Sequence, residues 1–343
     1  MNKIGTAITS ILSIKEIHIK DLANKILVID GQNMLYQFLT TIRQQDGSLL
    51  TDRKGRVTSH LIGLISRITN FLTKKLKIIF VFDGEVPELK HKELKKRKEV
   101  KMHAEKKYEE AKSAENIDDM KKFAGRTTRL TKEMVEEATL LLKAMGIPVI
   151  QAPSEGECQA SHMVAKGDAY AVVSQDADSL VFGATRVVRN LNVSGKRKIG
   201  AMYKSISPEL IELTENLNEL GIDREQLILV SMLVGTDFNI GGIKGIGPKK
   251  ALKLVKEFKD PEKIFEEAKW NEYFDISWER VYDTLKNMPV TNDYKIKWEN
   301  FNRDKIIKLL VDEHDFSIDR VNSLLEKLEA ANKEKLQKSL FEF

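Results

Sequence analysis

Acidic residues stand at the ends of three apolar runs in this chain. The runs cover residues 25–30, 77–83 and 169–176, and their last residues are Asp30, Asp83 and Asp176. Short β-branched runs between helical patterns are typical of parallel strands that are buried on both faces. Because ligands bind outside the carboxyl ends of such strands, we expect these three carboxylates to share one cleft.

Four further carboxylates have spacings that would bring them to the same cleft. Asp178 follows Asp176 by two residues, so in an extended loop both side chains would point the same way. Glu155 and Glu157 share this spacing just after a fourth apolar run, 147–151. Asp237 follows an apolar helical pattern at the entry to a glycine-rich loop.

Seven carboxylates in one cleft would repel one another unless cations neutralised them. Oxygen ligands suit Mg²⁺ or Mn²⁺, and two such ions roughly 4 Å apart could activate water and stabilise the leaving oxygen of a phosphodiester. The alternative is structural, because an Asp after a strand often caps the next helix and paired Glu residues can complement a helix dipole. Asp at three strand ends, together with the Glu-x-Glu and Asp-x-Asp pairs, favours the metal interpretation.

A glycine-rich segment, 241–251, has the sequence of a helix-hairpin-helix turn. Gly245 and Gly247 would let backbone N–H groups approach a phosphate, and Pro248 suits the first position of the following helix. Lys249 and Lys250 add charge for a grip on duplex DNA that is independent of base sequence. Such a turn can be merely structural, but its place directly after the carboxylates favours DNA binding.

A strongly basic segment follows the second strand-like run. From Lys90 to Lys107 it holds nine Lys or Arg residues against three Glu, and no Gly or Pro occurs between Pro87 and Gly125. This composition fits a long helix or a solvated disordered segment. Charge runs are commonly ordinary solvated faces. This one begins seven residues after Asp83, however, and could hold a single strand or a scissile phosphate beside the metals.

The strand-like runs alternate with helical patterns at roughly 57–75, 131–145, 155–166 and 224–233. This alternation predicts an α/β fold with a central, mostly parallel sheet flanked by helices. From about residue 225 to the end we expect mainly helix, and from about Lys333 a loose tail.

Composition excludes several classes of protein. The 343 residues carry a net charge of +5, which is too mild to indicate nucleic-acid binding by itself. A single cysteine, Cys158, excludes an internal disulfide framework and fits a reducing cytoplasm. No apolar run approaches the roughly 20 residues of a membrane span, and no export signal is evident at the N-terminus. We therefore expect a soluble cytoplasmic protein without a membrane partner.

The sequence closely resembles the flap endonucleases, especially those of archaea, over nearly its whole length. Six matching blocks occur in the family's order and spacing: Tyr36-Gln-Phe-Leu39, Thr58-Ser-His-Leu61, Val81-Phe-Asp-Gly84, Pro87-Glu-Leu-Lys90, Ala152-Pro-Ser-Glu-Gly-Glu157 and Gly245-Ile-Gly-Pro-Lys249. Asp312-Glu-His-Asp-Phe316 matches near the end. The resemblance implies cleavage near the base of 5′ flaps in branched double-stranded DNA, with 5′-to-3′ exonuclease activity, in replication (Okazaki fragment maturation) and repair.

The resemblance also implies roles for individual residues. Asp30, Asp83, Glu155 and Glu157 would serve one Mg²⁺, and Asp176, Asp178 and Asp237 the other, with Mn²⁺ able to substitute. Lys90 and Arg97 would be the catalytic basic pair that contacts the scissile phosphate. The implied DNA-binding residues are Tyr36, which stacks on a base, together with Arg43, Arg67, Glu155, Gly235, Asp237, Gly245, Gly247, Lys249 and Lys250. A K⁺ ion is expected at the hairpin when DNA is bound.

By the same resemblance the chain is a monomer divided into five parts. These are an N-terminal nuclease region with the start of a helical arch (1–100), the rest of the arch (101–130), an internal nuclease region with the helix-hairpin-helix (131–260), a C-terminal helical region (261–332) and a flexible tail (333–343). The arch as a whole would span about 88–130. The tail would bind a sliding clamp through Gln337, Leu340, Phe341 and Phe343.

Three features depart from the family pattern. Residue 2 is Asn2 where the family has Gly, Asp30 is followed by Gly31-Gln32, and the clamp motif lacks its second terminal aromatic. Two alternatives therefore remain. The chain could be a related nuclease that cuts bubbles, junctions or 5′ ends, or a DNA-binding module with an inactive metal site. The compact length, the continuous arch segment and the clamp motif favour flaps, because repair relatives carry large insertions there. The presence of all seven carboxylates argues against an inactive site.

The tail supplies the first testable prediction. Leu340 and Phe343 are three residues apart, as one helical turn would present them to a hydrophobic pocket, and Phe341 could replace the missing aromatic. Deletion of 337–343 should abolish clamp binding and clamp stimulation but leave clamp-free flap cleavage intact, because the tail only raises local concentration. Clamp pull-down and cleavage assays check this. Retained clamp binding would exclude the tail as the main contact, and lost clamp-free cleavage would place it in the fold.

Overall fold

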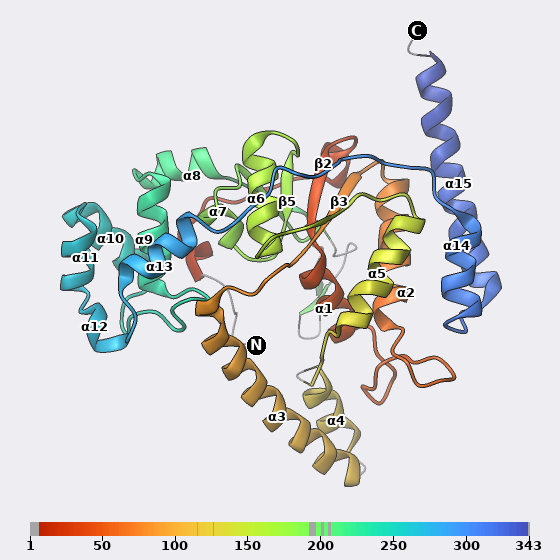
Figure 1. Ribbon diagram of the computed structural model, residues 1–343, viewed down its shortest axis with the longest axis horizontal. Coiled ribbons are helices and arrows are strands. Elements are labelled where there is room, and N and C mark those ends of the chain that lie inside the picture. Colours follow the sequence, from red (N-terminus) through yellow and green to blue (C-terminus); the bar gives the residue numbers. More distant parts are fainter. Residues whose placement is uncertain are drawn as a thin grey trace.

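A seven-stranded sheet forms the centre of the protein (Figure 1). The structure is a computed structural model that describes residues 7–114, 116–125, 127–191, 197–199, 202–204 and 207–341. The strands of the sheet are β1 (Lys15–Glu16), β2 (Ile26–Asp30), β3 (Lys77–Phe82), β4 (Val149–Gln151), β5 (Ala171–Val173), β6 (Arg186–Arg189) and β9 (Glu209–Glu212). A separate two-stranded ribbon pairs β7 (Arg197–Ile199) with β8 (Met202–Lys204).

The strand order in the sheet is β1-β9-β6-β5-β2-β3-β4. The strands β6, β5, β2, β3 and β4 pair in parallel, whereas β9 and β1 add antiparallel at one edge. The chain runs from β2 outward to β3 and β4, and then returns to place β5 on the other side of β2. Asp30 thus ends the strand at which the order reverses, where open α/β sheets form their binding crevice.

Helices cover both faces of the sheet. The α-helices are α1 (Gly31–Thr41), α2 (Ser59–Thr73), α3 (His91–Ser113), α4 (Ile117–Ala124), α5 (Lys132–Ala144), α6 (Gly156–Lys166), α7 (Asp178–Val181), α8 (Leu213–Leu220), α9 (Arg224–Val234), α10 (Pro248–Phe258), α11 (Pro261–Glu267), α12 (Trp270–Tyr273), α13 (Trp278–Lys286), α14 (Arg303–Ile307) and α15 (Ile318–Phe341). Three 3₁₀ turns, η1 (Ala7–Ile11), η2 (Ile19–Leu22) and η3 (Glu88–Lys90), and a π-helical turn, η4 (Lys308–Asp312), complete the elements.

Alternation along each strand divides the core into two layers. In β2, Leu27 and Ile29 face a core shared with α1, α2, α5, α14 and α15, whereas Val28 faces one shared with α6, α7, α9 and α10. Both cores consist of apolar side chains, most of them buried, which is why these strands read as continuous apolar runs rather than as alternating ones. The predicted α/β class with a mostly parallel sheet is confirmed.

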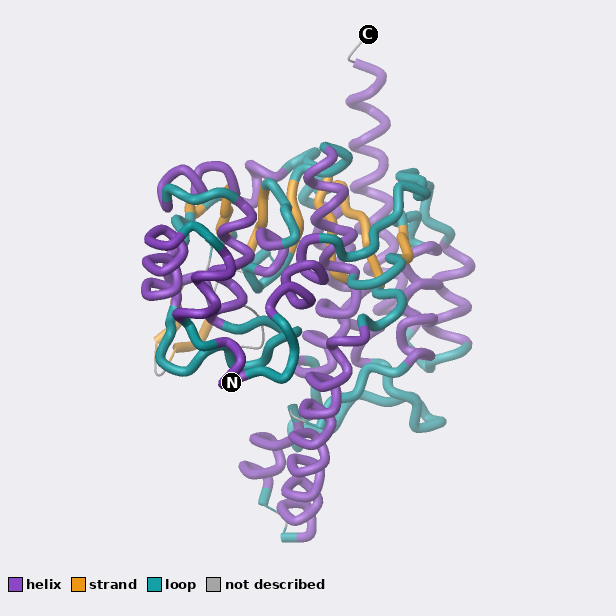
Figure 2. The backbone as a smooth tube through the Cα atoms, turned by 60° about the vertical axis from the view of Figure 1, so that its left-hand side comes forward, coloured by secondary structure: helices purple, strands orange, loops and turns teal. Residues whose placement is uncertain are grey.

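The basic segment forms a helical projection from the body. Helices α3 and α4 extend together away from the sheet before the chain returns to α5 (Figures 1 and 2). Ala104 and Ala111 of α3 are buried with Met120 and Ala124 of α4. At the surface of the projection, Nε and Nη2 of Arg129 donate to the carboxylate of Glu105 at 2.9 and 2.8 Å. Of the two predicted alternatives, helix is correct for the described part of this segment.

Two sequence-based expectations need correction, the extent of the strand in 169–176 and the start of the tail. The run 169–176 yields a strand of only three residues, β5, because the chain bends from Gln175. The region after 225 is mainly helical, as predicted, although one stretch interrupts the helices. Residues 287–302 form an irregular segment tied across the body, where Trp298 donates to the carbonyl of Ile78 and Tyr294 to Asp168. The expected tail boundary at Lys333 falls inside α15, whose backbone is helical through Phe341.

The side chains of the predicted clamp motif, from Gln337 to Phe343, lie outside the described residues, as does Asn2. Among the described residues, no helix combines the length and the apolar character that a membrane crossing requires.

At Gly84 the chain just after β3 lies against the chain just after β4. Its N–H donates to the carbonyl of Ser154 at 2.7 Å, and an added Cβ would overlap the backbone oxygens of Ala152 and Pro153. We expect Gly84→Ala to lower the free energy of unfolding by about 1–3 kcal/mol, because backbone atoms cannot move aside as a flexible side chain can. Chemical denaturation measures this. Gly125→Ala is the matched control, since its Cβ would meet open space at φ −64°. Equal effects of the two changes would contradict this account.

Candidate functional site

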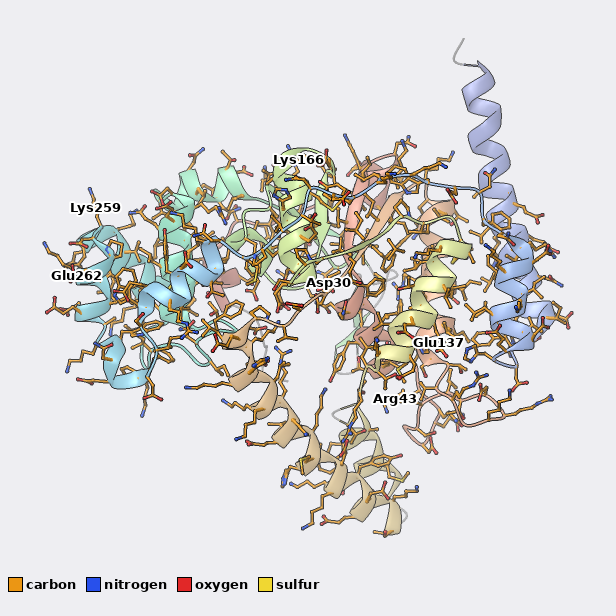
Figure 3. All side chains as sticks on the ribbon, in the orientation of Figure 1. Asp30, Arg43, Glu137, Lys166, Lys259 and Glu262 are labelled. Carbon is orange, nitrogen blue, oxygen red and sulfur yellow. The ribbon has the colours of Figure 1, made fainter. Side chains whose placement is uncertain are left out.

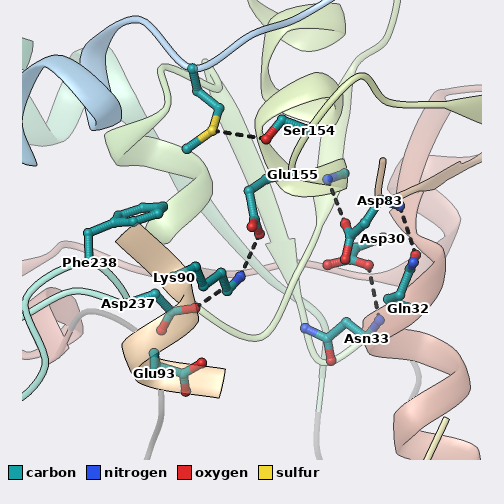
Figure 4. A network of polar contacts seen from close by, with 12 residues as sticks. Asp30, Gln32, Asn33, Asp83, Lys90, Glu93, Ser154, Glu155, Asp237 and Phe238 are labelled. Atoms are coloured by element: carbon teal, nitrogen blue, oxygen red, sulfur yellow. Dashed lines mark hydrogen bonds and ion pairs between the residues drawn. The ribbon is translucent and has the colours of Figure 1, made fainter. Parts of the chain in front are cut away.

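Asp30 and Asp83 lie side by side where β2 and β3 end (Figure 4). Asp30 caps α1, since its carboxylate accepts the N–H of Asn33 at 3.0 Å. Asp83 accepts the N–H of Gly156 at 2.6 Å, which joins it to the first turn of α6. The capping interpretation is therefore correct for Asp30, but it does not account for the second carboxylate beside it.

Glu155 and Glu157 approach from the start of α6. Glu155 is the residue before the helix, and Glu157 lies in its first turn. Glu157 accepts hydrogen bonds from the hydroxyls of Ser174, at 2.9 Å, and Ser179. Burial raises the pKa of Glu157 well above its usual value, and the negative charges of Asp178, Asp30 and Asp176 raise it further. Glu157 is therefore close enough to Asp30, Asp176 and Asp178 for their charges to interact, as the sequence indicated.

Asp176 and Asp178 reach the cluster by a different geometry from the one expected. The chain bends through Asp176, whose N–H donates to the hydroxyl of Ser174 at 3.2 Å, and Asp178 is the first residue of α7. The segment is therefore not the extended loop that we predicted. The bend is stabilised by Ser174 and by the short helix, and it still places both charges near Glu157.

The carboxylates at the strand ends hold protons more tightly than isolated acids would. Burial, followed by the charge of Asp83, raises the pKa of Asp30 to about 7. Burial also raises the pKa of Asp83, although the hydrogen bond from the N–H of Gly156 opposes this shift. Burial raises the pKa of Glu155 in the same way, and there the ammonium of Lys90 opposes it. Such crowding of desolvated negative charge is relieved when a cation binds.

Lys90 inserts its ammonium between two of the acids. Its Nζ lies 2.6 Å from Glu155 and 3.2 Å from Asp237. Burial alone would lower its pKa, but the charges of Glu155 and Asp237 hold that pKa above its usual value. Arg97 reaches the same oxygen of Asp237, at 3.2 Å. The two basic residues at the start of the projection therefore act as counter-ions to the predicted metal ligands.

The donor set fits divalent metal ions although, among the described residues, no three His, Cys, Asp or Glu side chains are gathered ready to hold one. All seven predicted ligands are carboxylates, the ligand type that Mg²⁺ and Mn²⁺ prefer. The ammonium of Lys90 bridges Glu155 and Asp237, whereas the buried acids repel one another. An ion of higher charge would draw the same oxygens together in place of the ammonium.

The predicted hairpin is confirmed as two helices, α9 and α10, joined by a glycine-rich loop. Gly235 has a φ of +112°, and a Cβ there would press against the backbone of Gly242, so this glycine is needed to close the loop. Gly245 and Gly247 instead face open space, and Pro248 begins α10 as expected. Lys249 and Lys250 are exposed on its first turn.

The three other predicted DNA-binding residues are Tyr36 on α1, Arg43 just after that helix and Arg67 on α2. Tyr36 of α1 has the ammonium of Lys101 5.2 Å from its ring centre. Arg43 donates to the carbonyl of Gly47 at 2.8 Å and to the hydroxyl of Thr128 (Figure 3). Arg67 is largely covered and lies over the ring of Phe38.

Sequence patterns missed one buried acid in this network, Glu93. It lies in the first turn of α3 and forms an ion pair with Arg97. Its spacing of four residues before Arg97 is the one at which helical side chains meet, and this spacing could have identified it.

Comparison with known proteins gives a consistent result. The chain matches the model of the XPG N-terminal domain over residues 4–104 and that of the XPG I-region over residues 146–237. It is 48% identical to Flap endonuclease 1 of Pyrococcus furiosus over 338 residues, 98% of each chain, and 48% identical to Flap endonuclease 1 of Thermofilum pendens over 321 residues, 93% of this chain and 92% of the relative.

Solved structures agree with these sequence matches. The flap endonuclease-1 from Methanococcus jannaschii superposes with a TM-score of 0.76 at 41% identity and covers 96% of this chain and 100% of its own. The catalytic core of Rad2 in complex with DNA substrate shares the fold, with a TM-score of 0.67 at 24% identity over 92% of this chain and 96% of its own. The chain therefore belongs to the flap endonuclease family.

Proposed function

We propose that this chain is a divalent-metal-dependent nuclease that cuts branched double-stranded DNA at the base of 5′ flaps and also degrades 5′ ends. The cluster of buried carboxylates at the strand ends, with Lys90 and Arg97 beside it, carries this proposal. In the cytoplasm of an archaeon, the class of organism to which its relatives belong, it would act in Okazaki fragment maturation and repair.

Two Mg²⁺ ions are the proposed cofactors, with Mn²⁺ as a substitute. Asp30, Asp83, Glu155 and Glu157 would hold one ion, and Asp176, Asp178 and Asp237 the other. When bound, such ions supply Lewis acidity that activates water and neutralises charge on a phosphodiester. Hydrogen bonds within the protein orient the carboxylates that would hold the ions. Ser174 and Ser179 fix the carboxylate of Glu157, and the N–H of Gly156 fixes that of Asp83.

Lys90 and Arg97 would contact the scissile phosphate. In the structure Lys90 is paired with Glu155 and Asp237, and Arg97 is paired with Asp237. When DNA binds, these donors must therefore leave the carboxylates for phosphate oxygens. A charged donor aimed at a phosphate in a partly desolvated site is worth far more than one in water. Tyr36, half-buried at the base of the projection, offers a ring on which a base could stack.

The hairpin would hold the duplex on one side of the cleft. Gly245 and Gly247 leave the loop open to a phosphate, the N-terminus of α10 attracts anions, and Lys249 and Lys250 add charge. A K⁺ ion in this loop would complete the contact, and Arg43 and Arg67 would touch DNA on the other side. The protein would act as a monomer, with Gln337, Leu340, Phe341 and Phe343 docked on a sliding clamp.

Flap cleavage should depend on divalent ions and on Asp178. We expect a labelled 5′-flap substrate to be cut in Mg²⁺ or Mn²⁺ but not in EDTA. Asp178→Ala should abolish cleavage yet leave flap affinity within a few-fold, because affinity comes mainly from phosphate contacts elsewhere. The control is Asp275→Ala, which removes a carboxylate that is 98% exposed. Near-wild-type cleavage by Asp178→Ala in Mg²⁺ would remove this residue from the metal site. A wild-type chain inactive on every flap would refute the function.

Gly247 tests the hairpin. Its backbone angles, φ −91° and ψ 176°, suit any residue, and an added side chain would meet no protein atom within 4 Å. Gly247→Val should therefore fold but weaken binding to all duplex substrates alike, because the side chain would occupy the space that a phosphate needs. Filter binding and thermal melting, measured together, decide the point. Unchanged affinity with a melting temperature several degrees lower would make the turn structural.

A further inference from the structure

Glu93 is a buried acid outside the set of seven predicted ligands. Its side chain is 6% exposed, although it stands on α3, a helix whose other charged side chains are mostly solvated (Figure 4). Burying a carboxylate is costly unless a partner compensates it. A helix N-terminus favours an acid in its first turn, but an exposed carboxylate would serve that purpose equally well. The burial therefore calls for a more specific role.

The partner of Glu93 is Arg97, one turn further along α3. An oxygen of Glu93 contacts Nε of Arg97, and Nη2 of Arg97 lies 3.2 Å from Asp237. Neither Nε nor the second oxygen of Glu93 has an aligned hydrogen-bond partner among the described residues, so the attraction between them is electrostatic. The guanidinium is thus held between an acid of its own helix and an acid of the hairpin loop.

We propose that Glu93 is the residue that positions Arg97 for the scissile phosphate; this rests on the function proposed above. An arginine side chain loses considerable rotational freedom when it is ordered. Glu93 restricts that freedom before DNA arrives, because it engages Nε while Nη2 lies beside Asp237. When phosphate replaces Asp237 as the partner of Nη2, Glu93 stays in place on the same helix.

The geometry separates this role from that of a metal ligand. Glu93 contacts the cation that faces the cluster, whereas the seven carboxylates belong to the strand ends, to α6 and α7 and to the hairpin loop. Its removal should therefore misdirect Arg97 without altering the affinity for divalent ions. A misplacement of about 1 Å in a contact of this kind can cost roughly 100-fold in rate.

The test compares Glu93→Gln with Glu99→Gln, which makes the same chemical change at an exposed position of α3. We expect Glu93→Gln to lower the single-turnover rate on a 5′-flap substrate by roughly 10- to 100-fold. Its Kd for that substrate and the Mg²⁺ concentration at half-maximal rate should each stay within about twofold. Glu99→Gln should match the wild type. Glu93→Asp, which keeps the charge but shortens the reach, should fall between them.

The double variant decides the mechanism. If Glu93 acts through Arg97, adding Glu93→Gln to Arg97→Ala should cause no further loss of rate. A further loss equal to that in the wild-type background, or a rate for Glu93→Gln equal to that of Glu99→Gln, would overturn the proposal. A shifted Mg²⁺ requirement would instead make Glu93 a ligand. If Glu93→Gln does not fold, the same comparisons are made with Glu93→Asp. Failure of the function itself would show as an inactive wild type.

Discussion

The structure depends on one electrostatic constraint, the repulsion among carboxylates that the fold gathers at one edge of its sheet. Parallel strands must end at the same edge, so Asp30 and Asp83 come together as a consequence of topology. Burial then prevents water from screening them, and the pKa of Asp30 rises to about 7. The surrounding elements each supply compensation: backbone N–H groups from α1 and α6, hydroxyls from Ser174 and Ser179, and the ammonium of Lys90.

The same constraint connects the helical projection to the body. Lys90 and Arg97 stand at the start of α3, and both contact Asp237, which belongs to the hairpin loop. These ion pairs therefore fix the start of α3, the start of α6 and the hairpin loop relative to one another. A segment that is basic and solvated along most of its length can in this way be fixed firmly at its base, where the proposed chemistry takes place.

Local patterns predicted the parts of the site that depend on strand ends, helix starts and turn residues. Asp30, Asp83 and the pair Glu155 and Glu157 follow from the positions of apolar runs, and Pro248 from the rules of helix initiation. The ion pair of Lys90 with Glu155 spans 65 residues, and no local pattern encodes it. The bend at Asp176 was missed although Ser174 and the short helix α7, which stabilise it, are close in sequence. The path of the irregular segment 287–302 depends on distant contacts, which no local pattern encodes. Trp298, for example, is held by a carbonyl 220 residues away.

The hairpin loop determines how far the proposed duplex contact lies from the cluster. Asp237 and Gly247 belong to one loop between α9 and α10, so no flexible linker separates them. Asn239 makes that loop rigid: its amide donates to the carbonyl of Met232 at 2.6 Å and accepts from the hydroxyl of Thr236 at 2.6 Å. The N–H of Ile243 returns to the carbonyl of Leu233, and Gly235 permits the close approach. These buried bonds fix the first part of the loop, which carries Asp237, against the end of α9. The proposed duplex contact at Gly247 therefore belongs to a loop whose other end is anchored beside the carboxylates.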